Sequence, residues 1–492
     1  MAAVRGGGSA RRDGGGAKRA GGAGRDAGDA KRVPVKLSPS RRMAVDTLRL
    51  VRERGAYVQN VALKVVHSTG ESHADKAFAE LLATGVVSTQ GTLDEAINRS
   101  LSSVNDIRPN VRDALRVSAY ELLFLHKPAH VVVDQGVELV RYVERKAANL
   151  ANAVLRKMLR DAEAFPWGDP AKDDAALARS FGFPVWLARL LVERYGREGA
   201  AGFMAACNEP APVFLAVNSI KATPREVFDE LARCGAKPSF VGPEDRGCIL
   251  AGNGRAAVSS AVLRDSRAIV TDASAQLAAL VATPAKGKRF LEVGSGRGTK
   301  TVLLQSNALK YNGEQSQMCC VDMHAFKNGV LGKRVEAAGL RGVKIFEGDA
   351  TRLDAIEGLA GECGAAAAGT PGLFGKALID APCSGLGTLR RHPEIRWSVT
   401  PGKIAELAEV GLGMLKSAAP LIEPGGTIVF STCTITREED EGTVEAFLSS
   451  EEGSGFELKP MGGRDFVLNR LEAGGPDVHF VAQLVKKAAD EG

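Results

Sequence analysis

The sequence predicts an α/β protein in which a parallel sheet, covered by helices on both faces, follows an all-helical domain and a small α+β module. Three observations predict this fold class. Apolar segments alternate with helical patterns in the C-terminal part, apolar stripes recur at helical spacing in the N-terminal part, and a mixture of both lies between them. Strands that are apolar throughout are typical of parallel sheets buried on both faces.

Length and composition indicate a soluble protein of several domains. With 492 residues, 45% of them hydrophobic and 25% charged, two to four globular domains are expected. No run of about 18 apolar residues is present, so no membrane span is expected, and the N-terminus lacks the apolar core of a secretory signal. Eight irregularly spaced cysteines without a C-x-x-C pair favour neither a disulfide framework nor a bound metal. We therefore expect a cytoplasmic monomer.

The first residues are strongly basic. Residues 1–42 contain 11 Lys or Arg and 3 Asp, a net charge of +8, while the whole chain carries +6, so the remainder carries −2. The Gly, Ala and Arg composition of residues 1–38 predicts a disordered tail, since it cannot bury enough apolar surface to fold. This tail is either a flexible arm that binds phosphates or a solvated extension of no specific role.

Residues 39–164 show the apolar stripes of amphipathic helices. Leu115, Ala119 and Leu122 form one such stripe, and Pro128 separates it from the next. No catalytic group gathers here. The segment resembles the NusB-like RNA-binding domain through Arg-Met-Ala at 42–44, Asp-Lys-Ala-Phe at 75–78, Leu-Arg-Val-Ser-Ala-Tyr-Glu at 115–121 and Asn-Ala-Val-Leu-Arg at 152–156.

Residues 165–270 predict the small α+β module. The alternation in 213–218 predicts a strand. Thr223 and Pro224 are placed as the cap and first residue of a helix that Gly235 would end.

Residues 271–487 carry the strand and helix alternation of the predicted parallel sheet. The predicted strands are 289–294, 318–323, 343–348, 376–382, 426–433 and 478–485. Ligands of such sheets bind at the carboxyl ends of the strands, where every motif described below occurs.

A glycine-rich turn follows the first of these strands. Gly294, Gly296 and Gly298 allow a tight turn and a close approach of the backbone to a ligand. Because such a turn could also hold a pyrophosphate, it leaves a dinucleotide dehydrogenase open.

Acids at the ends of the following strands indicate which cofactor the glycine turn binds. Asp322 lies 24 residues beyond Gly298, where a carboxylate can accept both ribose hydroxyls, and Asp349 is placed for an adenine amino group. With Glu292 at the start of the turn, this set resembles the pattern of S-adenosylmethionine-dependent methyltransferases. The alternative is that the acids only cap helices.

Two cysteines follow the ends of buried strands. A thiolate, from Cys383 or Cys433, could add to carbon 6 of cytosine and make carbon 5 reactive toward a methyl group. Asp380 is placed to act at ring N3. The ordinary interpretation of a cysteine is an inert buried residue, and it applies to four others: Cys207, Cys234, Cys248 and Cys363.

These two motifs carry a closer resemblance. Asp-Ala-Pro-Cys-Ser-Gly at 380–385 and Ser-Thr-Cys at 431–433 are similar to the cysteine motifs of the RNA cytosine-C5 methyltransferases, the NOL1/NOP2/Sun family. The helical segment in front, with 271–276 and 390–397, matches the bacterial Sun/RsmB branch. The resemblance covers nearly everything from about residue 40 onward.

The resemblance implies a Rossmann-like class I methyltransferase domain that uses S-adenosylmethionine. It implies Cys433 as the nucleophile, Cys383 as the residue that assists product release, and Asp380 as a contact to base and cofactor. The substrate would be a cytosine of small-subunit (16S) ribosomal RNA, of the cytosine-967 type. The implied cofactor-binding residues are Gly294, Ser295, Gly296, Arg297, Gly298, Thr299, Lys300, Asp322, Asp349 and Asp380.

The sequence departs from the family at two places. The turn reads Gly-Ser-Gly-Arg-Gly-Thr-Lys at 294–300, where the family usually has Cys-Ala-Ala-Pro-Gly-Gly-Lys. Asp440 stands where the family usually has Asn, and Arg437 where it often has Pro.

A basic cluster follows Cys383. We expect Arg390, Arg391 and Arg396, with His392 and Trp397, to contact RNA phosphates and a splayed base, and the target base to come from an unpaired region. A solvated loop with a core Trp is the alternative.

Other functions stay open at this point. A NusB-like antitermination module without catalysis would not need both cysteines, and a methyltransferase of proteins or small molecules needs no cysteine nucleophile. A dehydrogenase would leave the cysteine pair unexplained. A methyltransferase acting on another RNA would use the same residues.

Overall fold

The computed structural model describes residues 35–103, 107–359 and 374–488. Residues from Leu37 onward form one compact unit. The predicted disordered tail, 1–38, lies almost wholly outside the described residues, as does Cys363.

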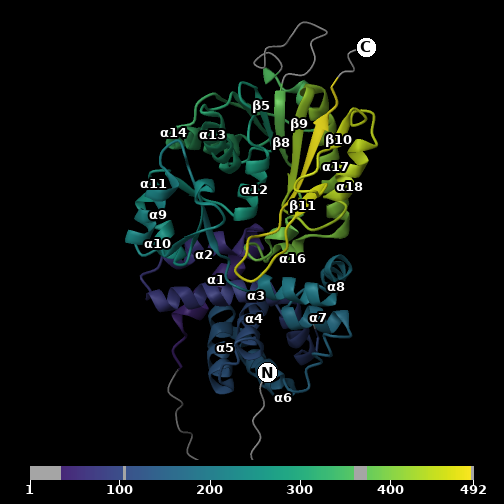
Figure 1. Ribbon diagram of the computed structural model, residues 1–492. Coiled ribbons are helices and arrows are strands. Elements are labelled where there is room, and N and C mark those ends of the chain that lie inside the picture. The colour runs from purple at the N-terminus through teal and green to yellow at the C-terminus, as the bar shows by residue number, and fades with distance from the viewer. Residues whose placement is uncertain (1–34, 104–106, 360–373, 489–492) are drawn as a thin grey trace, which may run out of the picture. The chain divides into compact units, whose positions relative to one another are not determined.

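The N-terminal part of this unit is helical, as the apolar stripes predict (Figure 1). Leu115 and Ala119 are fully buried in its core. The first Gly after α1 adopts a left-handed conformation, which ends that helix. The helices are α1 (Pro39–Arg54), α2 (Val58–His67), α3 (His73–Ser100), α4 (Pro109–Leu123), α5 (Ala129–Val143) and α6 (Ala148–Asp161).

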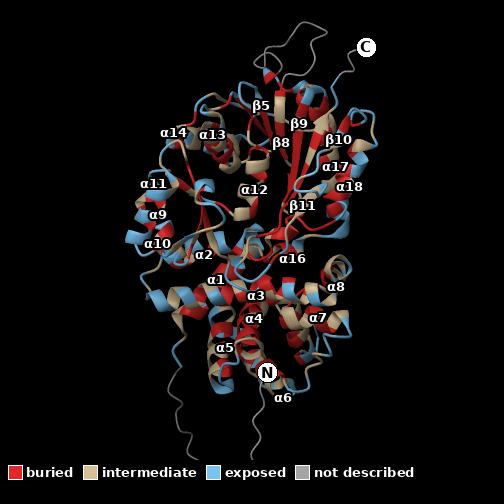
Figure 2. Ribbon diagram, viewed as in Figure 1, coloured by how far each residue is buried: buried red, intermediate tan, exposed pale blue. Residues whose placement is uncertain are grey.

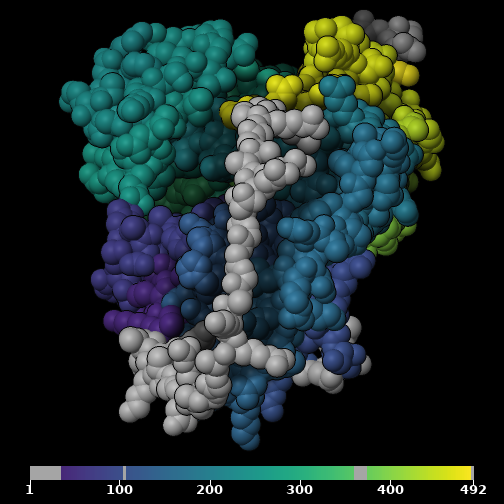
Figure 3. All heavy atoms as spheres, turned by 90° about the horizontal axis from the view of Figure 1, so that it is seen from below, coloured from purple at the N-terminus to yellow at the C-terminus, as the bar shows by residue number. Residues whose placement is uncertain are grey.

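Two helices continue toward the C-terminal domain, α7 (Asp174–Phe181) and α8 (Val185–Cys207). In Figure 3 the segment that contains α8 adjoins the C-terminal strands and helices, and the Arg194 guanidinium pairs there with Glu441 at 2.5 Å. Within the described residues no single helix has both the length and the hydropathy of a membrane span; only the bent pair α7 and α8, taken together, has both.

The α+β module contains the predicted strand and helix. Its antiparallel sheet has the order β2-β3-β1-β4. Thr223 caps α9, and Glu226 returns the bond, which completes a capping box. The elements are β1 (Val213–Val217), α9 (Pro224–Arg233), β2 (Pro238–Phe240), β3 (Cys248–Ala251), α10 (Gly254–Val258), α11 (Ala261–Arg264) and β4 (Ala268–Val270).

Among the described residues the C-terminal domain has one eight-stranded sheet, of order β10-β12-β9-β8-β5-β6-β7, with β11 paired to β12. Strands β5 to β9 are parallel, but β12 runs antiparallel to β9. The predicted parallel sheet is therefore confirmed for β5 to β9, whereas the last predicted strand, β12, makes the whole sheet mixed. The strands are β5 (Phe290–Val293), β6 (Met318–Asp322), β7 (Val343–Glu347), β8 (Phe374–Asp380), β9 (Ile422–Thr432), β10 (Phe456–Leu458), β11 (Phe466–Leu468) and β12 (Phe480–Lys486).

Helices cover both faces of this sheet, and the strands are largely buried (Figure 2). Leu291 and Val293 of β5 pack on one face with residues of α17 and α18, while Phe290 packs on the other with residues of α12, α13 and α14. This alternation is the strand periodicity of two. The helices are α12 (Ala273–Val281), α13 (Thr299–Asn312), α14 (Ala325–Ala338), α16 (Ile395–Ser398), α17 (Pro401–Ala418) and α18 (Glu441–Leu448).

Candidate active site

The glycine turn connects β5 to α13. Gly294, Gly296 and Gly298 all have positive φ, of 79°, 57° and 79°, a region that favours glycine. A Cβ on Gly294 would lie 2.3 Å from the carbonyl oxygen of Asp380, so this glycine is also required by the close approach of two strand ends. The Gly296 N–H donates to Asp322 Oδ2 at 3.1 Å. The first two strand-end motifs therefore meet.

The turn has the properties of a cofactor cradle. Ser295 Oγ is buried and has no hydrogen-bond partner among the described residues, although most buried polar atoms have one. Arg297 is exposed and Thr299 accepts a bond from Arg334. A backbone cradle with an orphan hydroxyl and a strand-end acid beside it fits S-adenosylmethionine.

The two acids differ in their surroundings. Asp322 is buried, and its second oxygen accepts from the His324 N–H at 2.9 Å. Asp349 is exposed and accepts from the backbone and hydroxyl of Thr351, and these bonds hold the pKa of its carboxyl below the usual value. Asp322 contacts the turn directly, whereas the bonds of Asp349 are to Thr351, two residues further along the chain.

Glu292 is buried at the end of β5, next to the start of α13. Its carboxyl lies in the core, where it accepts from the Thr301 hydroxyl at 2.7 Å and from Cys320 Sγ at 3.2 Å. Burial raises the pKa of Glu292 to about 7. Its expected place in the cofactor set stays a prediction, since both of these bonds are made within the protein.

Lys300 and Asp380 form an ion pair of 2.7 Å beside the turn. Burial lowers the pKa of Lys300, but the charge of Asp380 and the bond to it outweigh burial and leave the pKa above its usual value. Lys300 therefore stays charged, and the pair brings a fixed cation and anion to the end of β8.

The two predicted cysteines lie side by side. The Sγ atoms of Cys383 and Cys433 are 3.4 Å apart, and the Cys433 N–H donates to Cys383 Sγ at 3.2 Å. The register explains this, because Asp380 of β8 pairs with Ser431 of β9, so both strands end at the same level. The bond to Cys433 and burial raise the pKa of Cys383 well above its usual value, which keeps Cys383 a thiol.

A residue that the sequence did not reveal holds both cysteine loops. Glu439 is 2% exposed and accepts from the backbone and hydroxyl of Ser384 at 2.5 and 2.6 Å. It also accepts from the hydroxyls of Thr434 and Thr436 at 3.0 and 2.7 Å. The only signal for it in the sequence is an acid after a Thr-rich stretch.

The adjacent Asp440, one of the departures from the family, is fully buried. It accepts from the Thr432 hydroxyl, and its other oxygen has no partner within the described ranges. Burial raises the pKa of Asp440 well above its usual value, helped by the charges of Glu441 and Glu439. Burial therefore favours the uncharged carboxyl group, which has the shape and charge of the asparagine expected at this position.

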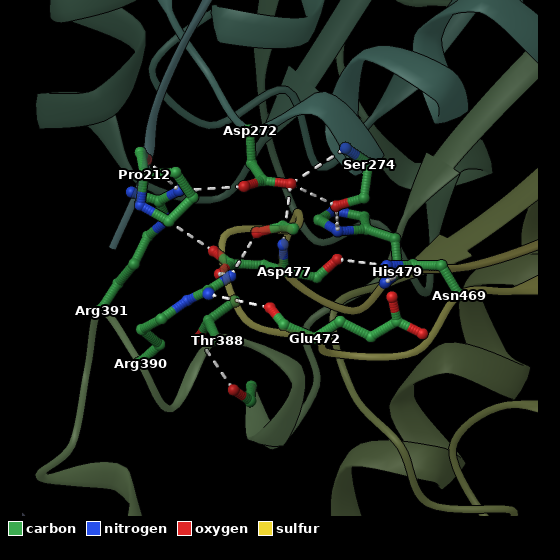
Figure 4. A network of polar contacts seen from close by, with 12 residues as sticks. Pro212, Asp272, Ser274, Thr388, Arg390, Arg391, Asn469, Glu472, Asp477 and His479 are labelled. Carbon is green, nitrogen blue, oxygen red and sulfur yellow. Dashed lines mark hydrogen bonds and ion pairs between the residues drawn. The ribbon is translucent and has the colours of Figure 1, made fainter. Parts of the chain in front are cut away.

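The three arginines of the basic cluster are taken up by contacts within the protein, which corrects the expectation that their guanidinium groups contact RNA. Figure 4 shows Arg391 between Asp477 and Asp272, at 2.6 and 2.9 Å. Arg390 is buried and donates to the Glu472 carbonyl at 3.2 Å. These guanidinium groups are occupied by acids and carbonyls that lie far away in the sequence.

Arg396 and Trp397 connect the catalytic domain to the helical part. The guanidinium of Arg396 is fully buried, donates to the Ser88 and Cys207 carbonyls at 2.8 and 3.2 Å, and lies over the Phe183 ring. Burial lowers the pKa of Arg396 to about 10, so it stays charged at neutral pH. The Trp397 indole donates to the Val87 carbonyl at 2.6 Å.

Three of the four cysteines expected to be inert and buried lie within the described residues. Cys207 and Cys248 are buried as expected, and burial raises their pKa to about 12 and about 11. Cys234 is exposed, which corrects its expected burial.

Comparison with known proteins gives three successive family matches. The profile of the NusB family matches residues 38–160, that of the RsmF/B-like ferredoxin-like domain matches 183–253, and that of the 16S rRNA methyltransferase RsmB/F matches 279–474. The ferredoxin-like description suits the antiparallel module, and the third match contains both cysteines.

Relatives match over most of the chain. The methyltransferase Rv1407 of Mycobacterium tuberculosis is 30% identical over 86% of this chain and 90% of its own. Ribosomal RNA small subunit methyltransferase B of Salmonella typhi is 27% identical over 91% of this chain and 98% of its own.

Solved structures share the fold. The crystal structure of PH0851 is similar with a TM-score of 0.73 at 21% identity, over 92% of this chain and 100% of that one. The structure of NSun6 from Pyrococcus horikoshii with SFG has a TM-score of 0.52 at 16% identity, over 62% of this chain and 99% of that one.

Proposed function

The chain belongs to the RsmB/F family of S-adenosylmethionine-dependent rRNA methyltransferases, and from this premise we propose that it methylates carbon 5 of a cytosine in 16S rRNA. The observation that carries the proposal is the pair of sulfur atoms 3.4 Å apart at the end of β8 and β9. A methyl transfer to a nucleophilic nitrogen or oxygen would need no thiol pair at this place.

The proposed cofactor-binding residues are those in and next to the glycine turn. The glycine turn with Ser295 and Asp322 would hold S-adenosylmethionine, which supplies an electrophilic methyl group. Arg297 and Thr299 belong to the same turn, and Asp349 lies at the next strand end. Asp380 would border both the cofactor and the target base.

Catalysis begins with the thiolate of Cys433, which adds to carbon 6 of the cytosine. The electron pair of the carbon 5–carbon 6 double bond moves toward N3, where the Lys300–Asp380 pair can supply a proton or balance the charge. Carbon 5 is then nucleophilic and would take the methyl group of bound S-adenosylmethionine, which would leave as S-adenosylhomocysteine. Transfer of the carbon 5 proton to water, together with return of any proton taken up at N3, re-forms the double bond and expels Cys433 as a thiolate.

Cys383 assists the last step. Because its pKa is raised well above the usual value by the bond to Cys433 and by burial, its S–H stays in place to donate to the Cys433 sulfur. A hydrogen bond to a departing thiolate stabilises it as a leaving group. The same donor would also stabilise the attacking thiolate before addition.

We also propose the target nucleotide, the location and the oligomeric state of the enzyme. The target is a cytosine of the cytosine-967 type. The enzyme acts in the cytoplasm as a monomer. Light scattering after gel filtration would measure its oligomeric state. A different RNA target is the second candidate, since the site chemistry would be the same for any unpaired cytosine.

The test is methyl transfer from labelled S-adenosylmethionine to protein-free 16S rRNA, with the labelled base mapped. We expect label on carbon 5 of one cytosine, and no transfer by Cys433→Ala, which should still bind the cofactor. Label on another atom, or full activity of Cys433→Ala, contradicts the proposal. If only another RNA class accepts label, the second candidate is correct.

A further inference from the structure

We propose that Tyr57, His392 and Glu394 form a base-binding subsite for a guanine that neighbours the target cytosine in the RNA. The proposal rests on the proposed function, because it concerns the RNA presented to the cysteine pair. It assigns a role to a side chain of the helical domain, in which the sequence showed no functional group.

The carboxyl group of Glu394 has free acceptors. Both of its oxygens are buried, yet neither has a hydrogen-bond partner among the residues that the structure describes. Its nearest cationic candidate, His392 Nδ1, is 3.8 Å away, too far for a hydrogen bond, and also has no such partner. Buried acceptors that are left unpaired are unfavourable, and because the side chain is still 16% exposed, its rotation toward a bound base would give both oxygens donors.

An aromatic surface lies beside this carboxyl group. The rings of Tyr57 and His392 are 4.3 Å apart and tilted by 37°. Tyr57 is 45% exposed, although it is a large apolar ring. Bases of single-stranded RNA stack on such rings. The pair therefore offers a stacking surface next to unpaired acceptors.

The subsite is close to the reacting sulfur atoms. The Gly387 N–H donates to the Cys433 carbonyl at 2.9 Å, and the loop continues through a His392 N–H bond to the Thr388 carbonyl at 3.0 Å. The Tyr57 ring contacts His392 of this loop, and burial raises the pKa of its phenol, with the charges of Glu394 and Cys433 acting in the same direction. A base held here is next to the target base and is not the target itself.

The position of the subsite is fixed from both sides. Tyr57 caps the start of α2, directly after the short loop that follows α1. Glu394 precedes α16, which Arg396 and Trp397 attach to α3. Figure 1 shows α16 between the helical part and the sheet. The helical domain thus completes a site whose other half belongs to the catalytic domain.

Guanine fits these groups by its hydrogen-bonding edge. Its N1–H and N2 amino group are two adjacent donors, which match the two oxygens of one carboxylate. Adenine and cytosine pair one amino donor with a ring acceptor, and uracil has a single N–H between two carbonyls. A bidentate contact of this kind changes affinity by about 10- to 100-fold between matched and mismatched bases.

The experiment is equilibrium binding of short RNAs to the full-length protein with S-adenosylhomocysteine present. The RNAs differ only in the base at one of the two nucleotides that flank the target cytosine. At one of these positions we expect guanine to bind about 10-fold or more tightly than adenine, cytosine or uracil, with hypoxanthine, which lacks the N2 amino group, between them. Equal binding of all bases at both positions overturns the proposal without any variant.

Variants separate the two halves of the subsite. Glu394→Gln should reduce the guanine preference to about 2-fold or less, while the exposed control Glu406→Gln keeps it. Tyr57→Ala should weaken the binding of all the RNAs by about 10-fold, whereas Tyr57→Phe, which keeps the ring, should not weaken it. An unchanged guanine preference in a folded Glu394→Gln contradicts the proposal.

Methylation of the same RNAs is measured in parallel. If none of these RNAs is methylated, the result counts against the proposed function. The guanine preference is tested by the binding data alone.

Discussion

At the scale of single residues, the proposed chemistry depends on two neighbouring sulfur atoms with different roles. Cys383 is held as a thiol by its bond to Cys433 and by burial, and the distance of 3.4 Å allows it to donate to the other sulfur. Replacing it with alanine removes this donor. We therefore expect Cys383→Ala to release the methylated base slowly and to accumulate a covalent protein–RNA adduct, visible as a slower band on a denaturing gel. The double variant with Cys433→Ala should show no band. Normal turnover without an adduct would remove the release role from Cys383.

Glu439 acts at the same scale by positioning the cysteines, without touching the substrate. It binds the Ser384 backbone and the Thr434 hydroxyl, so each cysteine has a neighbour attached to one carboxylate. Glu439→Gln keeps the volume but converts an acceptor into a donor that faces donors. We expect kcat to fall by about 10- to 100-fold, with KM for RNA and cofactor affinity nearly unchanged, since loose positioning of this kind costs rate.

The matched control for Glu439 is its exposed neighbour, Glu438→Gln. A loss of cofactor binding that parallels the loss of rate would instead mean that Glu439 only supports folding.

At the scale of elements, the glycine turn and the end of β8 are in contact. A Cβ at Gly294 would meet the carbonyl oxygen of Asp380 at 2.3 Å, whereas one at Gly296 would meet nothing closer than 3.8 Å. Both have positive φ, so both substitutions share a backbone strain of about 1 kcal/mol and the presence of a Cβ in the cofactor turn, and only Gly294→Ala adds the collision with Asp380. We expect Gly294→Ala to weaken S-adenosylmethionine binding at least 10-fold more than Gly296→Ala, as measured by calorimetric titration. Equal losses would mean that the contact with Asp380 does not shape the cradle.

The elements also show what could be predicted from the sequence. Strand ends followed by glycines, acids and cysteines locate a site, because parallel strands bring their carboxyl ends together. An apolar run does not encode strand direction, so the antiparallel β12 was not predicted. The arginines after Cys383 look like an RNA surface, because their partners Asp272 and Asp477 lie about 80 to 120 residues away. Glu439 was missed for the same reason, since its loop partner Ser384 is distant in sequence.

At the scale of the whole molecule, Arg396 joins the helical part to the catalytic domain. Its buried guanidinium donates to carbonyls of α3 and α8. Arg396→Ala leaves these acceptors unpaired in the interface, which we expect to lower the free energy of unfolding by about 2–4 kcal/mol. Calorimetry should also show separate unfolding of the helical part. Arg189→Ala, in an exposed pair of 3.6 Å, should change stability by less than about 1 kcal/mol. A single unshifted transition in Arg396→Ala would contradict this role.

Glu292 makes the stability of the whole molecule depend on pH. Burial raises its pKa to about 7 from an ordinary 4.5, so the folded state favours the uncharged carboxyl. A raised pKa contributes stability in full below about pH 4.5, and that stability is lost as the pH rises toward 7 and beyond. The amide group that Glu292→Gln introduces can still accept from Thr301 and Cys320, but it cannot ionise.

We therefore expect the stability of Glu292→Gln, relative to the native protein, to increase between pH 5 and pH 8. The increase is about 3 kcal/mol at most, from the pKa difference of about 2.5. Urea unfolding of both proteins at pH 5, 6, 7 and 8 measures it. A constant difference over this range would mean that Glu292 ionises in the fold as readily as in the unfolded chain. Because β5 and α13 flank this carboxyl, the cofactor turn between them should lose order with the same pH dependence.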